Sequence, residues 1–336
     1  ILIDSPDNWS HAPLILSILK AMSKSDVDEV FLEFLQKCAK NEKEVFQQLY
    51  QMKDFFETIQ GLLDSSDPPR SPLFLLYCIA PIEDAALKLA NHPMLSSLIN
   101  MKGYQIQRLQ IFTSLCYHES FCTRTQYIDG IIHTLVKSIS VKSLTKYAVH
   151  LICAFSSHPE GCRLLNENGV LELFTQFFLS TTNEVAEASH VILRNFARNN
   201  RKKSTIPQGA MIVSCLMQDM IYDVDKRVEI LETIVTLVKT MPGCVQEHDL
   251  LKIILPLISQ QGNPLLMKLA LKLFAIVEPV SLRNIYPQLL AQIYKILNNP
   301  ELMFPEIIEE CLKVVISVEE NFDIIVFLQK TQLSRF

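Results

Sequence analysis

One stretch near the middle of the chain decides the fold. It reads Asn168-Gly-Val-Leu-Glu-Leu-Phe-Thr-Gln-Phe-Phe-Leu-Ser-Thr-Thr-Asn-Glu-Val-Ala-Glu-Ala-Ser-His-Val-Ile-Leu-Arg-Asn-Phe-Ala-Arg-Asn-Asn200. A polar turn with a Gly precedes an apolar segment, a short break rich in Ser and Thr, and a second apolar segment. In both segments apolar residues recur every three or four positions, which is the pattern that buries one face of an α-helix. The stretch therefore predicts two packed helices.

The same plan recurs along the sequence. Two further segments of this kind contain Gly130 and Gly209, which lie 39 and 40 positions on either side of Gly169. In each segment a helix is predicted to begin directly after the Gly. At about the same step, helices are predicted after Asp249 and Pro287, although the Gly is lost there. A period of this length is typical of stacked helical repeats, because no single repeat can bury its apolar stripe alone.

With its Gly, helix, polar break and Leu-x-Asn-Phe-Ala ending, the quoted stretch resembles a single armadillo repeat. The resemblance covers residues 93–300 and fades toward both ends. It implies an all-α fold, a right-handed α-α superhelix of armadillo-like or HEAT repeats with a long concave surface. Such a fold implies that the chain holds other macromolecules, and it implies no particular partner.

Two terminal regions flank the repeats. Residues 1–70 are predicted to form a helical capping region, residues 71–300 the armadillo-like repeats, and residues 301–336 a closing repeat, all within one continuous solenoid. The last predicted helix, Asp323–Leu328, is apolar for a terminal position. Further sequence, a second copy of the chain in a homodimer, or a partner protein would each cover it.

The capping region is predicted to be helical up to a proline-rich segment. Its helices are expected over Leu14–Met22, Val27–Ala39 and Val45–Leu63. The segment Asp64–Pro72 contains three Pro, which remove hydrogen-bond donors and fix φ. We therefore expect a surface loop there.

Composition limits the environment in which the chain works. Hydrophobic residues make up 49% and charged residues 20%, which is ample for a core. Apolar runs such as Leu250–Ile258 are too short to span a bilayer, and no signal segment opens the chain. The nine Cys are scattered singly, which suits a reducing compartment. The chain is predicted to be intracellular, in the cytoplasm or the nucleus, without membrane insertion.

The sequence lacks the common catalytic motifs. Its eight Gly are nowhere spaced as a phosphate-binding loop requires, and neither Gly-x-Ser-x-Gly nor His-Glu-x-x-His occurs. One cluster, Cys116-Tyr-His118-Glu119-x-x-Cys122, holds three zinc-competent side chains, but no matching half of a four-ligand site is evident. We therefore expect no enzymatic activity, no cofactor and no metal, with core or turn packing for this cluster.

Asn195 occupies a distinctive position of the resembling repeat. In karyopherin-alpha and related armadillo proteins, an Asn at this third-helix position holds the backbone of an extended peptide. Such a ladder needs repetition. The equivalent positions here are Ser114, Ala154, Thr236 and Ala275, and the only Trp is Trp9. The interpretation as a nuclear-import receptor is thus weakened, and Asn195 equally suits a hydrogen bond to a neighbouring backbone group.

The densest local charge comes from the basic run Arg194, Arg198, Arg201, Lys202 and Lys203. Arg forks suit an acidic or phosphorylated segment of a partner protein. Cations are also favoured at a helix C-terminus without any partner. Two interpretations of this run therefore remain: a docking site for a partner, and a solvated helix end without a partner. The net charge of −5 argues against general nucleic-acid binding.

The sequence therefore predicts a non-enzymatic scaffold or adaptor whose solenoid surface binds a partner protein or peptide. One alternative is a regulatory repeat domain of a larger protein, for instance one with an enzymatic domain, because the chain opens at Ile1 without a Met. Another alternative is a transport receptor or a nucleic-acid-binding solenoid, which rests on fold analogy and on the basic run.

Overall fold

The computed structural model describes most of the chain. The described residues are 11–22, 28–41, 43–178, 185–199, 209–222, 224–240, 245, 248–259, 263–282, 284–302 and 304–317. They belong to two compact units, Ile1–Val170 and Leu171–Phe336. Each unit is considered by itself below.

Helices are the regular elements of the described residues, which contain no strand. The predicted all-α fold is therefore confirmed. Within the described ranges, no helix combines the length and the apolar character needed to cross a membrane.

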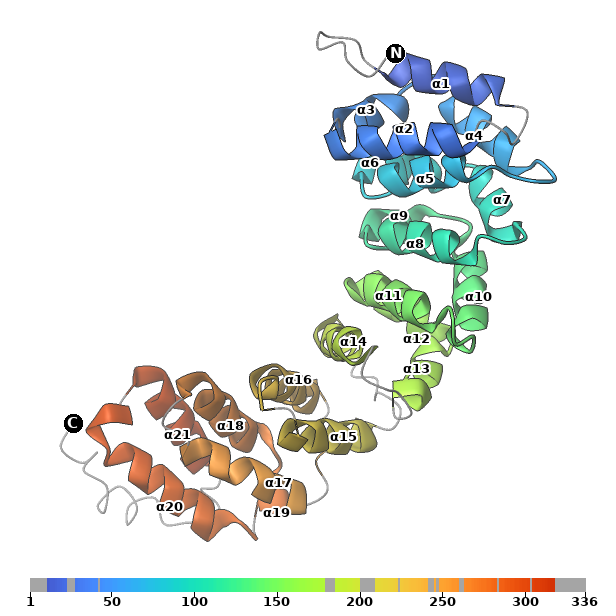
Figure 1. The fold of residues 1–336 in the computed structure, drawn as a ribbon. Helices are drawn as coiled ribbons and strands as arrows, with labels where there is room; N and C mark the ends of the chain where they lie inside the picture. Colours follow the sequence, from blue (N-terminus) through green and yellow to red (C-terminus); the bar gives the residue numbers. More distant parts are fainter. Residues whose placement is uncertain are drawn as a thin grey trace. The chain divides into compact units, whose positions relative to one another are not determined.

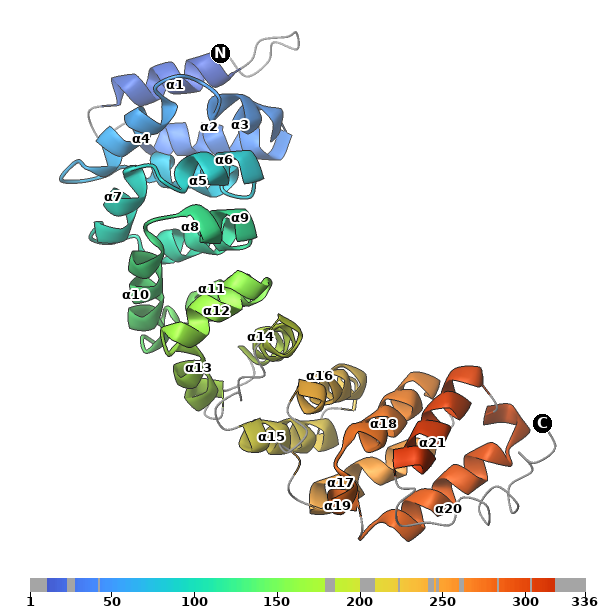
Figure 2. The ribbon, with the colours of Figure 1, turned by 180° about the vertical axis from the view of Figure 1, so that it is seen from behind.

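In the first unit, helices that hold the same place in successive repeats pack against one another (Figure 1). The third helices form one stack, which consists of α2 (Asp28–Asn41), α5 (Arg70–Ile79), α8 (Gln105–Cys116) and α11 (Thr145–Ser156). The second helices form another, which consists of α1 (Ala12–Ala21), α4 (Phe55–Leu63), α7 (Met94–Asn100) and α10 (Ile128–Ile139). The first helices, seen from behind in Figure 2, are α3 (Lys43–Leu49), α6 (Glu83–Leu89), α9 (Glu119–Arg124) and α12 (Pro159–Glu167). The unit is thus a solenoid of three-helix repeats.

The second unit follows the same plan. Its third helices stack in the order α14 (Ala186–Asn199), α16 (Arg227–Thr240), α18 (Pro264–Ile276) and α21 (Pro305–Ser317). Its second helices are α15 (Gly209–Tyr222), α17 (His248–Ile254), which a 3-10 turn η4 (Leu255–Ser259) continues, and α20 (Tyr286–Leu297). Shorter elements are α19 (Pro279–Leu282) and η5 (Pro300–Leu302), and α13 (Val170–Phe178) begins at the last residue of the first unit.

The apolar stripes of the third helices supply much of the core. In α8, Leu109, Phe112 and Leu115 are fully buried, and in α16 so are Leu231 and Ile234. Burial of each such side chain contributes about 1.5–3 kcal/mol. Because an inner third helix packs between two others, the core continues from repeat to repeat.

Two arginines join the second helix of a repeat to the third. Arg108 on α8 is buried and donates from Nη1 to the carbonyl oxygen of Met101, 2.7 Å away, and from Nη2 to that of Ile99. Arg227 on α16 donates from Nε to the carbonyl oxygen of Met220 over 2.9 Å. The acceptors lie at the C-terminal ends of α7 and α15, where carbonyls lack intrahelical donors.

The regular spacing of glycines has more than one physical cause. Gly169 has a φ of +67° directly before α13, in the left-handed region where Gly is favoured. Gly130 lies instead inside the first turn of α10, where an added Cβ would be 2.9 Å from Cδ1 of Ile99 on α7. Its small size lets the two helices approach closely. Gly209 is the first residue of α15. The prediction that each helix begins after its Gly thus holds for α13 and is wrong for α10 and α15.

The first repeats differ in detail from the sequence prediction. A single helix over Val45–Leu63 is wrong, because α3 and α4 are separated by a turn in which Asp54 has a φ of +66°. The predicted loop over Asp64–Pro72 ends early, because α5 begins at Arg70. The helix predicted over Asp323–Leu328, and with it the homodimer contact, lies outside the described residues.

A carboxylate of α2 explains the early start of α5. Asp28 is buried and accepts hydrogen bonds from the N–H of Arg70 over 2.7 Å and from the N–H of Ser71 over 3.0 Å. The Ser71 hydroxyl also donates to it. These N–H groups have no acceptor within the helix, so Asp28 acts as an N-cap supplied by the preceding third helix.

Candidate peptide-binding surface

In the first unit, the stacked third helices hold an open cavity of about 390 Å³ on the side that faces solvent. Its walls come from α5, α8 and α11. The side chains that line it include Tyr77, Gln110, Ser114, Lys146, Tyr147 and His150. Tyr77 is 45% exposed. Aromatic rings beside hydroxyl and amide groups suit a peptide, because a segment without secondary structure needs donors and acceptors for its backbone.

Lys146 gives this cavity its positive charge, and its neighbours stay uncharged. Burial, and then the charge of Lys146, lower the pKa of His150, so the imidazole is neutral near pH 7. Beside the cavity, the Tyr117 hydroxyl lies 4.0 Å from Sγ of Cys153. Burial, followed by Cys153, raises the pKa of Tyr117 to about 12. The site therefore offers one cation among neutral hydrogen-bonding groups.

In the second unit, third helices line a larger cavity of about 560 Å³, with walls from α14, α16 and α18. Its apolar part includes Val228 and Val235 of α16 together with Leu265 and Leu269 of α18. Leu265 is 53% exposed. Apolar side chains left open to solvent in a hollow are typical of binding surfaces.

The predicted basic site borders this cavity. Arg194 on α14 places Nη2 3.0 Å from Oε1 of Glu229 and Nη1 3.3 Å from Oε2 of Glu232. Arg198 places Nη2 3.1 Å from Oε1 of Glu232 and also lines the cavity. Both arginines are thus ion-paired with α16, the third helix of the next repeat. Arg194, whose side chain is 18% exposed, is the more enclosed of the two.

The other predicted residues are placed as follows. Asn195 is half-buried on α14, between Arg194 and Phe196. Arg201, Lys202 and Lys203 lie outside the described residues. The structure thus brings Arg194, Asn195 and Arg198 onto one helix, and their part in partner binding stays a prediction.

Sequence reasoning missed two lysines of the same cavity. Lys239 of α16 and Lys272 of α18 both line it, and neither takes part in an ion pair among the described residues. Desolvation, and then the charge of Lys272, lower the pKa of Lys239. The two ammonium groups are therefore close enough to repel each other. In the sequence, the two residues are visible only as lysines within apolar helical segments.

The Cys and His cluster joins successive repeats by hydrogen bonds. Nε2 of His118 lies 3.1 Å from the carbonyl oxygen of Ala80 at the end of α5, and Nε2 of His158 lies 2.9 Å from that of Cys116 at the end of α8. The Gly161 N–H donates to Nδ1 of His158 over 3.0 Å, so Nε2 carries the proton and donates. In the described part of the chain, no three His, Cys, Asp or Glu side chains are placed to hold a metal.

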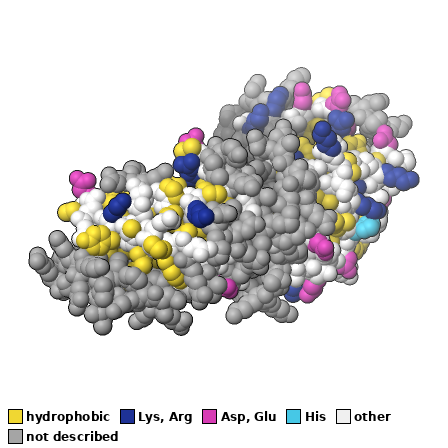
Figure 3. Space-filling model, turned by 90° about the horizontal axis from the view of Figure 1, so that it is seen from below, with side chains coloured by type: hydrophobic (Ala, Val, Ile, Leu, Met, Phe, Trp, Pro, Cys, Tyr) yellow, Lys and Arg dark blue, Asp and Glu magenta, His cyan; other side chains and the backbone are white. Residues whose placement is uncertain are grey.

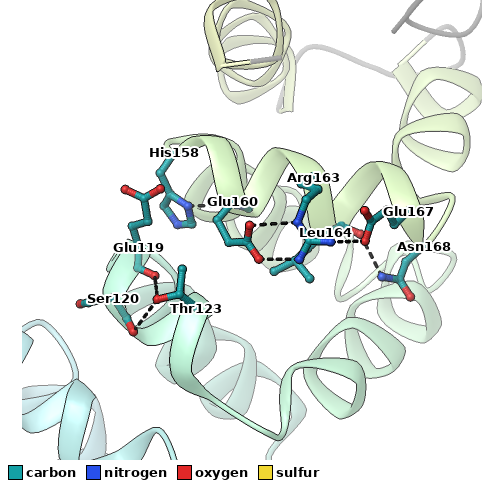
Figure 4. Close-up of polar contacts among 10 residues, drawn as sticks. Glu119, Ser120, Thr123, His158, Glu160, Arg163, Leu164, Glu167 and Asn168 are labelled. Atoms are coloured by element: carbon teal, nitrogen blue, oxygen red, sulfur yellow. Dashed lines mark hydrogen bonds and ion pairs between the residues drawn. The ribbon is translucent and has the colours of Figure 1, made fainter. Parts of the chain in front are cut away.

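Two thiols of the first helices α9 and α12 add contacts of the same kind. The thiols of Cys122 and Cys162 donate to the carbonyl oxygens of Cys116 and Ser156, at matching places in the two repeats. Along α12, Arg163 pairs with Glu160 and Glu167 of its own helix (Figure 4). These groups are occupied with local structure, which leaves the third-helix faces as the stronger candidate for binding.

Apolar exposure is not confined to the two cavities. Ile316 on α21 is 62% exposed, and Phe304 just before that helix is 45% exposed. On the face drawn in Figure 3, hydrophobic side chains lie beside separate Lys and Arg side chains. Figure 3 also shows Asp and Glu side chains, so this face is not uniformly basic.

The repeats and their stacking define the class of protein: each unit is an all-α solenoid of armadillo/HEAT-like repeats. Among solved structures, the chain is similar to an engineered protein with a TM-score of 0.71 at 14% sequence identity, over 96% of this chain and 81% of the other. That likeness shows the fold alone. No protein-family model matches the sequence, and no curated protein matches it.

Two designed armadillo repeat proteins are similar at a lower level. One has a TM-score of 0.40 at 14% identity, over 78% of this chain and 99% of its own. The other, solved in complex with the peptide (KR)4, has a TM-score of 0.40 at 16% identity, over the same shares of the two chains. At this TM-score neither likeness carries an argument about the present chain.

Proposed function

We propose that this chain is a non-enzymatic scaffold or adaptor. It binds segments of a partner protein along the solvent-facing sides of its third helices. The observation that carries this proposal is that each unit has an open cavity on this class of helix. Both cavities combine exposed apolar or aromatic side chains with lysines. That combination suits recognition of a polypeptide segment.

Most contacts that hold the fold lie away from these faces, apart from the ion pair of Arg198 with Glu232 in the second cavity. The third helices bury their apolar stripes between repeats, and the His, Arg and Asp contacts described above join helix ends. A ligand on the solvent-facing side of the third helices would replace solvent there without breaking these contacts. Neutral donors and acceptors such as Gln110 and Ser114 would then satisfy the backbone of an extended segment.

A thiol one turn along α11 from His150 of the first cavity, Cys153, lacks the activation of a catalytic nucleophile. Nucleophilic Cys residues need a lowered pKa, since the thiolate is the reactive form. Burial raises the pKa of Cys153, although the hydrogen bond with Tyr117 opposes that effect. Cys153 is therefore a protonated thiol near neutral pH.

Crosslinking of the full chain in cell extract, read by mass spectrometry, tests the proposal. We expect partner crosslinks at Lys146, which lines the first cavity, and fewer at the exposed Lys137 on the second helix α10. The variant Tyr77→Ala with Tyr147→Ala should weaken partner capture about tenfold or more, because aromatic anchors dominate such contacts.

A matched control uses another exposed tyrosine. Tyr294 on the second helix α20 is 42% exposed, close to the 45% of Tyr77. Tyr294→Ala should capture the partner as the parent does. Crosslinks spread evenly over second and third helices, or equal loss in both variants, would count against third-helix binding.

A further inference from the structure

The cavity of the second unit is a groove with a defined direction. On α16, Val228, Val235 and Lys239 recur at spacings of seven and four residues, and on α18 Leu265 and Lys272 are seven apart. Such spacings place side chains on one face of a helix. Each wall therefore has an apolar residue near the start of its helix and a lysine near its end, and on α16 Glu232 lies between them.

The carboxylates around this groove are ion-paired with other cations, and Glu310 acts on Lys239 only at longer range, where Lys313 opposes it. Glu232 is ion-paired with Arg198 and Arg194. On the neighbouring α21, Glu309 and the buried Glu310 are both ion-paired with Lys313, at 2.7 and 3.0 Å. Among the described residues, no carboxylate pairs with Lys239 or Lys272.

An anion between the two lysines would remove their repulsion. Both ammonium groups face the same cavity, and desolvation and Lys272 disfavour the charged form of Lys239. A carboxylate or phosphoryl group placed there would accept hydrogen bonds from both, and charge-assisted hydrogen bonds are the stronger kind. The adjacent apolar walls, with Leu265 half exposed, would take up a hydrophobic side chain.

We propose that the groove between α16 and α18 binds an extended acidic peptide segment, with its acidic side chain between Lys239 and Lys272 and an apolar side chain against Leu265. The inference rests on the proposed function and gives that function a ligand class. The seven-residue step from Leu265 to Lys272 corresponds to a helix rise of about 10 Å. An extended peptide spans this distance in about three residues. The acidic and apolar residues of the ligand are therefore about three positions apart.

Selection from a random 12-residue peptide library displayed on phage, with the full chain as target, tests this assignment. We expect enrichment of peptides with Asp or Glu about three positions from an apolar residue. A fluorescein-labelled synthetic copy of an enriched peptide should bind the variant Lys239→Gln with Lys272→Gln at least about tenfold more weakly than the parent. Lys295→Gln, on the exposed side of α20, is the matched control and should bind as the parent does.

A charge reversal separates loss of the site from loss of the fold. Lys239→Glu places a carboxylate beside Lys272, where it forms an internal ion pair and occupies the site. This variant should lose peptide binding while its melting temperature stays equal to that of the parent or rises. Retained binding of the acidic peptide by Lys239→Glu would overturn the proposal.

The remaining outcomes each decide against the acidic peptide. The proposal of an acidic peptide would be overturned by enriched peptides without an acidic preference or by a failure to enrich any peptide. Equal affinity of the parent and the Gln double variant would overturn it as well. Single-stranded oligothymidine bound by the parent and released by the same double variant would assign the lysines to nucleic acid instead. In these cases, crosslinks at the third helices would still support the proposed function, so the two failures can be distinguished.

Discussion

At the scale of single residues, the start of α12 shows how a contact between repeats fixes residue identity. His158 donates to the end of α8 and accepts from Gly161, so its two ring nitrogens are both used. Gly161 is buried, and an added Cβ would lie 1.8 Å from the carbonyl oxygen of Phe155 and 2.8 Å from Cε1 of His158. Only a residue without a side chain fits there.

Gly161→Ala is therefore expected to destabilise the protein by about 2–4 kcal/mol, because backbone must move to relieve the clash. Urea unfolding followed by circular dichroism measures the effect. Gly61→Ala is the matched control, since Gly61 lies in α4 with nothing within 4 Å of the added Cβ. It should stabilise by about 0.5–1 kcal/mol, as Ala does over Gly in a helix. Shifts of the same sign in both variants would contradict this account.

At the scale of elements, α5 depends on α2 for its N-terminus. A helix N-terminus leaves its first N–H groups without acceptors, and here Asp28 of the preceding third helix accepts from Arg70 and Ser71. The proline-rich sequence before α5 predicts a loop, and the loop is shortened because a distant residue caps the helix. Local sequence does not show a cap that comes from another repeat.

Asp28→Ala should lower the free energy of unfolding by about 1–3 kcal/mol, because it leaves buried donors without an acceptor. Amide hydrogen exchange of Arg70 and Ser71 should also become faster. Asp67→Ala, at an exposed position in the turn before α5, is the control and should change neither quantity. Unchanged exchange at Arg70 and Ser71 in the Asp28 variant would rule out this capping role.

At the scale of the whole molecule, buried thiols tie the stability of the fold to alkaline pH. Burial raises the pKa of Cys162 from 9.0 to about 12, and burial followed by the charge of Glu310 raises that of Cys311 to about 12. Between pH 9 and about pH 12, the thiolate of each Cys therefore forms in the unfolded chain and not in the folded chain. The stability from each protonated thiol is therefore complete below pH 9 and is lost as the pH rises toward 12.

Comparison of the parent with Cys311→Ala, which lacks one such thiol, measures this effect. In reducing urea titrations, the stability advantage of the parent should shrink by roughly 1.4 kcal/mol between pH 8 and pH 10, the equivalent of one pKa unit. An advantage that is the same at both pH values would show that Cys311 ionises alike in the folded and unfolded chain.

The candidate site was only partly predictable from the sequence. Charge density alone pointed to Arg194 and Arg198, of which Arg198 lines the groove of the second unit. It did not show that both are ion-paired with α16, because Glu229 and Glu232 are more than thirty positions away. Lys239 and Lys272 were not predicted because neither belongs to a dense run of charge, and they lie on different helices.

By itself, the sequence determined that the chain is helical and that it repeats about every forty residues, because the periodicity of apolar side chains is a local property of the chain. The tertiary structure alone decided which residues of different repeats meet. Gly130 reaches Ile99, Asp28 caps α5, and Lys239 faces the same cavity as Lys272. These contacts depend on the register between stacked helices, which periodicity within one helix does not specify.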